Sequence, residues 1–372
     1  MSGHKSDVIR MNAQDAFLHN GVTKNDFHRW HIGSKVKGEY MMATPKILVV
    51  GSFVMDQIAT TDVIPREGQT VLGKSFHKAP GGKGANQAVQ AARLGADVSI
   101  VGKIGCDSNG EEMIRVCREA GIDVSRVLYD ENSTSGCAVI ILQEKENEPT
   151  QNRILVIPGT NMMIRADEID FLKHEVGNYD MVILQNEIPM EINVLTAKYA
   201  YEAGVPVMLN SAPSALLPEE LYRYLTFISP NETEIEDMTG VHIPHVDNAV
   251  DRVAARRAAE ILRNKGVKNV LITLGSAGAL LLNDEGEFYS PCAENVTVAD
   301  PTAAGDSFVG AFCTGACCGW DWKTILVFAN HTAAVTVSKI GAMPSLPTIE
   351  QVLKCLEERN IVAPKVSILH RS

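Results

Sequence analysis

Short, wholly apolar segments recur along this chain and alternate with longer stretches that have a helical pattern. The first, at 47–50, is a continuous run of Ile, Leu and Val, which is typical of a strand buried on both faces of a sheet. Further strands are expected at 181–185, 205–210, 227–229 and 270–274, with helices at about 165–177, 190–203, 231–239 and 249–265. This alternation predicts an α/β fold: a doubly wound, mostly parallel central sheet flanked by helices.

Two further regions have a strand-like composition that does not fit the central sheet. Residues 57–78 alternate loosely between apolar and polar, and residues 135–143 and 153–157 flank a polar loop at 144–152. We expect a hairpin within 135–157 to join strands within 57–78 in a small β-sheet lid. A small isolated sheet with an apolar face needs a partner, so a homodimer through paired lids is expected.

Residues 1–44 differ from the rest of the chain. They are polar and of mixed charge, without the apolar core of a signal peptide, and Asp7, Asp15 and Asp26 argue against a transit peptide. We interpret 1–44 as a disordered or non-native N-terminal extension, 45–360 as the folded domain and 361–372 as a C-terminal tail.

Charge and cysteine content narrow the partners and the compartment. The 372-residue chain has a net charge of −11, which argues against nucleic acid or an anionic membrane as the main partner. No apolar run approaches the ~20 residues of a membrane span. The eight cysteines are scattered, without a Cys-x-x-Cys pair, so we expect reduced thiols in a cytoplasmic protein rather than disulfides or a zinc site.

Residues 300–312 combine a turn of small residues with the start of a helix. Ala303, Ala304 and Gly305 leave their backbone N–H groups accessible at a helix N-terminus, where the helix dipole favours an anion. Asp306 follows in the first helical turn. A carboxylate beside an anion site suits a general base, if a neutral hydroxyl lies between it and a phosphate. The alternative is an acidic residue that simply stabilises the helix start.

A glycine-rich loop at 79–88 opens another helix. Its glycines permit close backbone approach to a ligand, and Lys83 and Asn86 supply a cation and an amide. The spacing matches neither a Walker A loop nor a dinucleotide-binding fingerprint. Asp56 follows the first strand, where open α/β sheets bind ligands, and it could accept hydrogen bonds from two sugar hydroxyls. A turn residue is the alternative interpretation of Asp56.

Together these motifs resemble the ribokinase-like carbohydrate kinase family over about residues 46–358. Two signatures carry most of the resemblance: Gly-Gly-Lys-Gly-Ala-Asn-Gln-Ala at 81–88 and Asp-Pro-Thr-Ala-Ala-Gly-Asp at 300–306. Supporting stretches at 185–187, 230–234 and 272–278 stand in the family's order. The resemblance implies an ATP-dependent kinase that phosphorylates the terminal hydroxyl of a pentose, with D-ribose, converted to ribose 5-phosphate, as the expected substrate. It also implies that the lid excludes water.

The resemblance implies a role for each motif. Asp306 would take the proton of the sugar hydroxyl, and the backbone N–H groups of Ala303, Ala304 and Gly305 would form an anion hole. The substrate-binding positions, besides Asp306, are Val54, Met55, Asp56, Gly82, Lys83, Gly84, Ala85, Asn86 and Glu187. The nucleotide-binding positions, besides Gly305 and Asp306, are Asn231, Glu234, Thr273, Leu274, Gly275, Ser276, Ala277, Gly278 and Asn330. Asn231 and Glu234 would help to organise Mg²⁺, although an isolated Asn-x-x-Glu is usually a helix cap.

The resemblance further implies a site for a monovalent cation. Asp300 and Thr302 match one half of it, and the other half is matched by Thr336, Lys339, Gly341 and Ser345, mostly through backbone carbonyls. Potassium there would hold the loop before Asp306 and shape the anion hole without touching substrate. The expected cofactors are therefore ATP, Mg²⁺ and K⁺.

One position departs from the family pattern. Ribose-specific members typically have asparagine two residues before the first aspartate of the site, where this chain has Val54. Valine cannot bond a hydroxyl, and one such contact is worth about 1–3 kcal/mol. An apolar residue here suits 2-deoxyribose, unless another side chain or a water makes the contact.

Alternatives to a ribose kinase stay open. One is a kinase of the same fold for 2-deoxyribose, a nucleoside or fructose. Another is a sugar- or nucleotide-binding protein without catalysis, against which Asp306 and its small-residue turn argue. A dinucleotide-dependent oxidoreductase is the third, and the chain lacks its fingerprint.

Overall fold

The computed structural model describes residues 33–36, 39–144, 151–246 and 249–369. The chain divides into two compact units, Met1–Ala43 and Thr44–Ser372. In the first unit, β1 (Gly33–Val36) and β2 (Glu39–Met42) pair as an antiparallel hairpin. Residues 1–32 lie outside the described part of the chain, so the interpretation of 1–44 as an extension stays a prediction.

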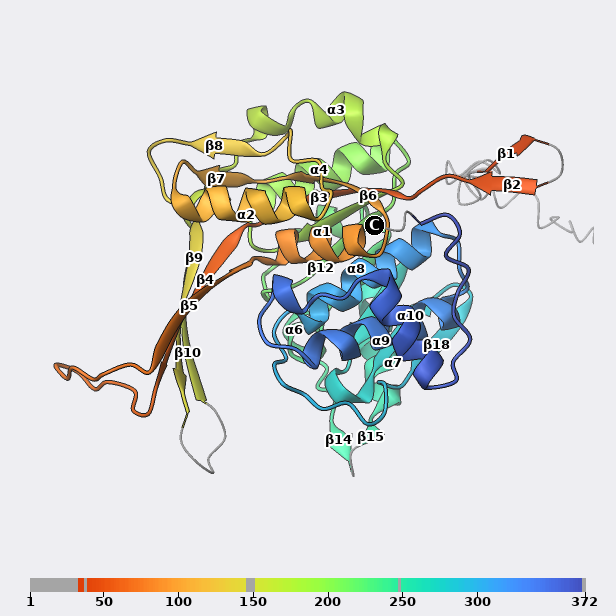
Figure 1. Cartoon of the computed structure of the whole chain (residues 1–372). Coiled ribbons are helices and arrows are strands. Elements are labelled where there is room, and N and C mark those ends of the chain that lie inside the picture. The colour runs from red at the N-terminus through yellow and green to blue at the C-terminus, as the bar shows by residue number, and fades with distance from the viewer. Residues whose placement is uncertain (1–32, 37–38, 145–150, 247–248, 370–372) are drawn as a thin grey trace, which may run out of the picture. The chain divides into compact units, whose positions relative to one another are not determined.

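An eight-stranded sheet forms the centre of the second unit, in the order β18-β17-β16-β13-β12-β11-β3-β6 (Figure 1). Six neighbouring strands are parallel: β3 (Lys46–Val50), β6 (Asp97–Val101), β11 (Met181–Gln185), β12 (Val207–Asn210), β13 (Phe227–Ser229) and β16 (Asn269–Thr273). The remaining two are antiparallel: β17 (Ala279–Asn283) and β18 (Gly286–Ser290). The prediction of a mostly parallel sheet is confirmed.

Alternate residues of each buried strand supply the two faces of the sheet. In β3, Ile47 and Val49 belong to one core cluster, and Leu48 and Val50 belong to the other. The first cluster is covered by α1 (Lys83–Arg93), α2 (Ser108–Glu119), α8 (Ala304–Cys317), α9 (Trp322–Val337) and α10 (Ile349–Glu358). The second is covered by α3 (Leu172–Glu175), α4 (Met190–Glu202), α5 (Glu219–Tyr222), α6 (Glu232–Thr239) and α7 (Arg252–Asn264).

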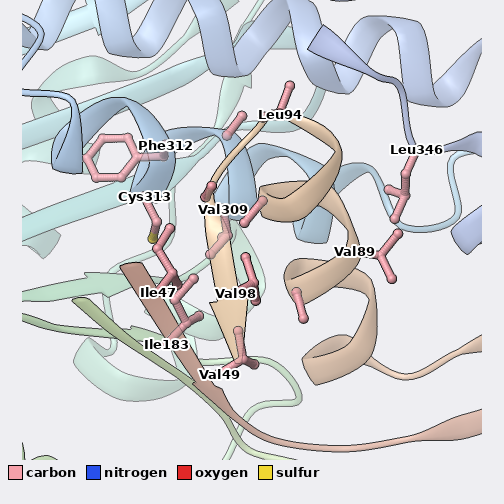
Figure 2. Packing of buried hydrophobic residues seen from close by; sticks show 14 of the residues in the cluster. Ile47, Val49, Val89, Leu94, Val98, Ile183, Val309, Phe312, Cys313 and Leu346 are labelled. Atoms are coloured by element: carbon pink, nitrogen blue, oxygen red, sulfur yellow. The ribbon is translucent and has the colours of Figure 1, made fainter. Parts of the chain in front are cut away.

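Helices α1 and α8 lie close together on the first face of the sheet. Figure 2 shows Val89 of α1 and Val309 and Phe312 of α8 around strand residues such as Ile47 and Val98. These buried residues are less than 10% exposed. The packing fixes the starts of both helices, which carry the two glycine- and alanine-rich motifs.

A separate four-stranded sheet, with the order β10-β9-β4-β5, projects to one side of the main sheet (Figure 1). Its strands are β4 (Val54–Thr61), β5 (Ser75–Gly81), β9 (Gly136–Gln143) and β10 (Gln151–Ile157). The hairpin and its pairing with the earlier strand are as predicted. The earlier strand begins before residue 57, so Asp56 lies within a strand and the turn interpretation is wrong.

Residues 165–177 do not form the single helix that the sequence predicted. They contain 3₁₀ turns at Ala166–Ile169 and Val176–Asn178 on either side of α3. Ile169 at the end of the first turn and Leu172 at the start of α3 are both buried, so the short elements bury apolar side chains without one continuous helix. The remaining strands form small pairs: β7 (Lys103–Gly105) with β8 (Leu128–Asp130), and β14 (His245–Val246) with β15 (Ala249–Val250). Among the described helices, none has the length and apolarity needed to cross a membrane.

Candidate active site

The site begins where strand order reverses in the main sheet. β6, which follows β3 in the main sheet, lies on one side of β3, and the later strand β11 lies on the other side. The carboxyl ends of the strands at such a reversal form a ligand crevice. Ser52 follows β3 and donates through Oγ to Glu187 Oε2, after β11, at 2.5 Å. The backbone N–H of Lys83 donates to the same oxygen at 3.1 Å. The glycine-rich loop therefore lies directly over the crevice.

Close backbone approach explains a glycine in this loop. Gly82 has a φ of 92°, and a Cβ there would lie 2.6 Å from the backbone nitrogen of Val54. Real Cβ atoms do not come that close to a backbone atom, so a larger residue would push the loop away from β4. Gly82 therefore joins the glycine-rich loop to the base of the lid.

Val54 and Asp56 lie on the same face of β4, because side chains two residues apart in a strand point the same way. Val54 pairs with Gly81 and is 7% exposed. A Cβ on Gly81 would lie 3.1 Å from Asp56 Oδ2. The residue that departs from the family pattern therefore faces the same space as the carboxylate beside the glycine-rich loop.

Acidic side chains from distant segments converge on Asp56. Burial, together with the negative charges of Glu187, Asp300 and Asp306, raises the pKa of Asp56 to about 6. Like charges have this effect only when they are close. Asp56, Glu187 and Asp306 come from three separate parts of the chain, and each of them lies against the glycine-rich segment at 79–88.

Asp306 lies in the first turn of α8 and is 7% exposed. Its Oδ2 accepts a hydrogen bond from Asn86 Nδ2 at 2.8 Å, and its Oδ1 accepts one from Gln87 Nε2 at 2.9 Å. Two neutral amides thus hold the carboxylate without neutralising its charge. This contact joins the helix of the glycine-rich loop to a helix more than 200 residues later.

Lys83 supplies the positive charge of the site. Burial alone would lower the pKa of Lys83, but the charges of Asp306, Glu187 and Glu234 raise it above its ordinary value. The side chain therefore stays an ammonium ion. It lies within the electrostatic reach of Asp306, Glu187 and Glu234.

The turn before Asp306 has an unusual backbone. Ala303 is in the left-handed conformation, with φ of 62°, which alanine adopts at a cost. Such strain is common at ligand sites. The N–H of Ala304 donates to the carbonyl of Pro301 at 3.3 Å, a long bond. One of the three donors expected in an anion hole therefore has a weak partner within the turn.

The nucleotide-side residues gather around the start of α6. Asn231 and Glu234 form a reciprocal capping box, and Glu234 Oε2 also accepts from Ser211 Oγ at 3.1 Å. The N–H of Thr273 donates to the carbonyl of Pro230 at 3.0 Å, which places the loop of Leu274, Gly275, Ser276, Ala277 and Gly278 next to the cap. Capping accounts for the Asn-x-x-Glu spacing by itself.

Asn330 supports this region from within the protein. It is 3% exposed, and its Nδ2 donates to the carbonyls of Ser290 and Pro291 at 3.1 and 3.0 Å. The amide therefore fixes the segment after β18 rather than pointing freely outward. Its influence on a nucleotide would pass through that segment.

Asp300 joins the two halves of the expected cation site. Its Oδ1 accepts from the N–H of Thr302 and its Oδ2 from the N–H of Gly341, both at 2.9 Å. Burial would raise the pKa of Asp300, but hydrogen bonds from Thr302 and Gly341 lower it below its ordinary value. Thr336 and Ser345, which lie within five residues of Gly341 in the sequence, are fully buried. Lys339 donates to Gln351 Oε1 at 2.9 Å, so its side chain turns to α10.

The structure adds residues to which the sequence assigned no role. Ser52 anchors Glu187, and Gln87 holds Asp306. Both are fully buried polar side chains, and the place of Gln87 within the signature at 81–88 was the available signal. Surface hollows occur beside α10, around Leu353 and around Cys355. They lie away from these side chains, so the convergence of charges, not the size of a hollow, locates the site.

Comparisons with known proteins agree with this geometry. Residues 44–349 match the model of the pfkB family carbohydrate kinase. A ribokinase of Haemophilus influenzae is 33% identical over 84% of this chain and 98% of its own length. A deoxyribokinase of Salmonella typhimurium is also 33% identical, over 82% and 96%.

The fold of this chain is also similar to that of a solved structure. The ribokinase of Arabidopsis thaliana, complexed with ribose and ATP, is 33% identical and has a TM-score of 0.76. The match covers 85% of this chain and 99% of that one. Family members of this kind transfer a phosphoryl group to an alcohol. The chain therefore belongs to the pfkB family of carbohydrate kinases, with the ribokinase-like fold.

Proposed function

We propose that this protein transfers the γ-phosphoryl group of ATP to the 5-hydroxyl of D-ribose. The observation that carries the proposal is that Asp306, bonded by Asn86, and Asp56, next to Gly81, both lie against the glycine-rich segment that contains Lys83. They offer a base, a cation and a hydroxyl acceptor, the groups that phosphoryl transfer to a sugar requires. The kinship with ribokinases, one of them solved with ribose and ATP, names the substrates.

Each residue has a defined part in the reaction. Asp56 and Glu187 accept hydrogen bonds from sugar hydroxyls and orient the ring. Asp306 takes the proton of the 5-hydroxyl while the hydroxyl oxygen of the sugar bonds to the γ-phosphorus. The bond between the γ-phosphorus and the bridging oxygen of ADP breaks, and ADP leaves. Lys83 and the N–H groups of the turn before α8 stabilise the negative charge on the transferring group. Charge stabilisation speeds transfer to any acceptor, whereas ring orientation favours transfer to the sugar over transfer to water.

Mg²⁺ fits the nucleotide side of this site. Mg²⁺ keeps most of its waters and takes few protein ligands, so a single acidic group such as Glu234, with the amide of Asn231, is enough to place it. The described residues hold no group of three or more metal-binding His, Cys, Asp or Glu side chains. When bound, Mg²⁺ would neutralise charge on the phosphates.

The residue at position 54 should set the preference between ribose and 2-deoxyribose. We expect Val54→Asn to raise the ratio of kcat/KM for ribose over 2-deoxyribose about tenfold, because an amide can bond the 2-hydroxyl. ADP release with each sugar gives the ratio. Val54→Leu, with the same side-chain shape as asparagine and no polar atom, is the control. Equal ratios in the two variants would mean that position 54 does not read that hydroxyl.

A potassium ion is proposed beside Asp300. The ionised carboxylate and the backbone that it clamps at Thr302 and Gly341 supply oxygen ligands of the kind that K⁺ prefers. We expect replacement of K⁺ by tetramethylammonium, at constant ionic strength, to lower kcat about tenfold through a misplaced turn before Asp306. In Asp300→Asn, kcat should no longer differ between K⁺ and tetramethylammonium. The same kcat in both salts for the unmodified protein would contradict the cation site.

The lid is proposed to form a homodimer. Ile154, Leu155 and Val156 in β10 are 56, 64 and 53% exposed, and the alternation of a strand puts apolar side chains on both faces. We expect Ile154→Lys combined with Leu155→Lys to convert a dimer into a monomer in sedimentation velocity. Leu216→Lys, at a 97% exposed position outside the lid, should leave the dimer intact. A monomeric unmodified protein would refute this assembly.

The remaining proposals concern domains and location. We propose that 45–360 is the catalytic domain, that 1–44 is an extension without a part in the reaction, and that 361–372 is a tail. All eight cysteines are free thiols, which suits the reducing cytoplasm. A sugar-binding protein without catalysis is the second candidate, and it would bind ribose without releasing ADP.

A further inference from the structure

Gln87 is a buried side chain that links the carboxylate of Asp306 to the centre of the sheet. It is 0% exposed. Its Nε2 donates to Asp306 Oδ1 at 2.9 Å and to Asn210 Oδ1 at 3.2 Å. Its Oε1 accepts from Gln185 Nε2 at 2.7 Å. All the polar atoms of this one side chain are therefore engaged, and its contacts reach α8, β11 and β12.

The direction of this chain of amides is set by the carboxylate. An ionised aspartate only accepts hydrogen bonds, so the NH₂ group of Gln87 has to face Asp306. Its carbonyl oxygen then faces β11, where the NH₂ group of Gln185 meets it. Both amide donors therefore point towards the negative charge, and each polarises the next.

Helix packing brings the two side chains within reach. Gly310 lies one turn after Asp306 in α8. A Cβ there would lie 3.0 Å from the backbone carbonyl oxygen of Gln87 and 2.9 Å from Cβ of Gln90. Only a residue without a side chain lets α1 approach α8 so closely. The short distance between the helices lets the Gln87 amide reach the carboxylate without a bridging water.

Each oxygen of Asp306 thus has its own amide donor, Asn86 on Oδ2 and Gln87 on Oδ1. Two bonds at the two ends of a carboxylate stop rotation about its Cβ–Cγ bond. Amides are neutral, so they fix the group and leave its charge available for a proton. A lysine or arginine in place of Gln87 would pair with the charge and weaken the base.

We infer that Gln87 is a positioning residue, which holds the Asp306 carboxylate in the orientation that receives the proton of the substrate hydroxyl. Gln185 acts behind it by fixing the Gln87 amide. The geometric part of the inference stands on the structure alone, and its catalytic part rests on the proposed function.

The test uses Gln87→Met in the full-length protein, because methionine has a similar length and no amide. Crystal structures of the unmodified and variant proteins, solved with the same additives, report the position of Asp306. We expect the carboxylate of the variant to rotate and to lose the contact with Asn86 Nδ2. An unchanged carboxylate in the variant would overturn the inference, whatever the enzyme's activity.

Kinetics provide the second readout. We expect Gln87→Met to lower kcat for the sugar about 10²-fold, because small misplacements of a catalytic group cost that much, with the KM for sugar and for ATP changed much less. Gln87→Glu should not rescue it, since a second carboxylate repels the first. A fall in stability with unchanged kcat would show that Gln87 is only structural and would overturn the inference.

Gln90→Met is the matched control. Gln90 lies in the same helix and is equally buried; its amide donates to the carbonyl of Pro347 at 3.0 Å and accepts from Ser307 Oγ at 2.9 Å. It does not contact Asp306, so this variant should lose a similar amount of stability while Asp306 keeps its position. If the unmodified protein releases no ADP with any sugar, the proposed function fails, and the crystal structures still decide the role of Gln87.

Discussion

Replacing Asp306 by asparagine should lower kcat about 10³-fold while the protein stays folded. An asparagine amide cannot take a proton from the sugar hydroxyl. Its NH₂ group would also face the amide donors of Asn86 or Gln87, which now bond the two carboxylate oxygens. The measurement is single-turnover formation of sugar phosphate, with circular dichroism to follow the fold.

Asp321→Asn is the control for this change. Asp321 caps the N-terminus of α9 through its side chain, and aspartate and asparagine cap helices about equally well. The control should therefore keep both kcat and thermal stability. Turnover within tenfold of the unmodified protein in Asp306→Asn would exclude Asp306 as the base.

Replacing Lys83 by methionine should lower kcat/KM for ATP by about 10²–10³-fold, the loss typical of a missing group that stabilises transition-state charge. Lys83 is the cation to which Asp306, Glu187 and Glu234 are electrostatically coupled. Without it, an incoming triphosphate meets these carboxylates uncompensated. Calorimetric titration measures the loss of affinity for ATP, and steady-state kinetics measure the fall in kcat/KM.

Lys103→Met separates this effect from the loss of any buried lysine. Lys103 is 3% exposed and pairs with Glu168 at 2.8 Å, outside the candidate site. Its loss should reduce stability, because the contacts of the buried ammonium group with Glu168 and with the carbonyl of Met163 disappear, and should leave ATP affinity in place. Lys83→Arg retains the charge and should recover part of the activity. Equal ATP affinity in Lys83→Met and the unmodified protein would remove Lys83 from the phosphate site.

Local pattern was sufficient for most of the fold. The apolar run at 47–50 predicted a strand buried on both faces, and β3 has both neighbours and both cores that such a strand requires. The hairpin at 135–157 was predicted from its composition and its polar loop. The single helix predicted at 165–177 was wrong, because the buried residues Ile169, Leu172 and Val176 have a spacing that short successive helical turns satisfy as well as one continuous helix.

The sequence by itself determined the sheet, the glycine-rich loop and the candidate base, because burial, backbone freedom and helix starts are encoded by neighbouring residues. Only the tertiary structure decided that Asp56 belongs to the lid and that Gln87 holds Asp306. A hydrogen bond depends on where two side chains meet in space. Between Gln87 and Asp306 that meeting is made by the packing of α1 against α8, which no local pattern contains.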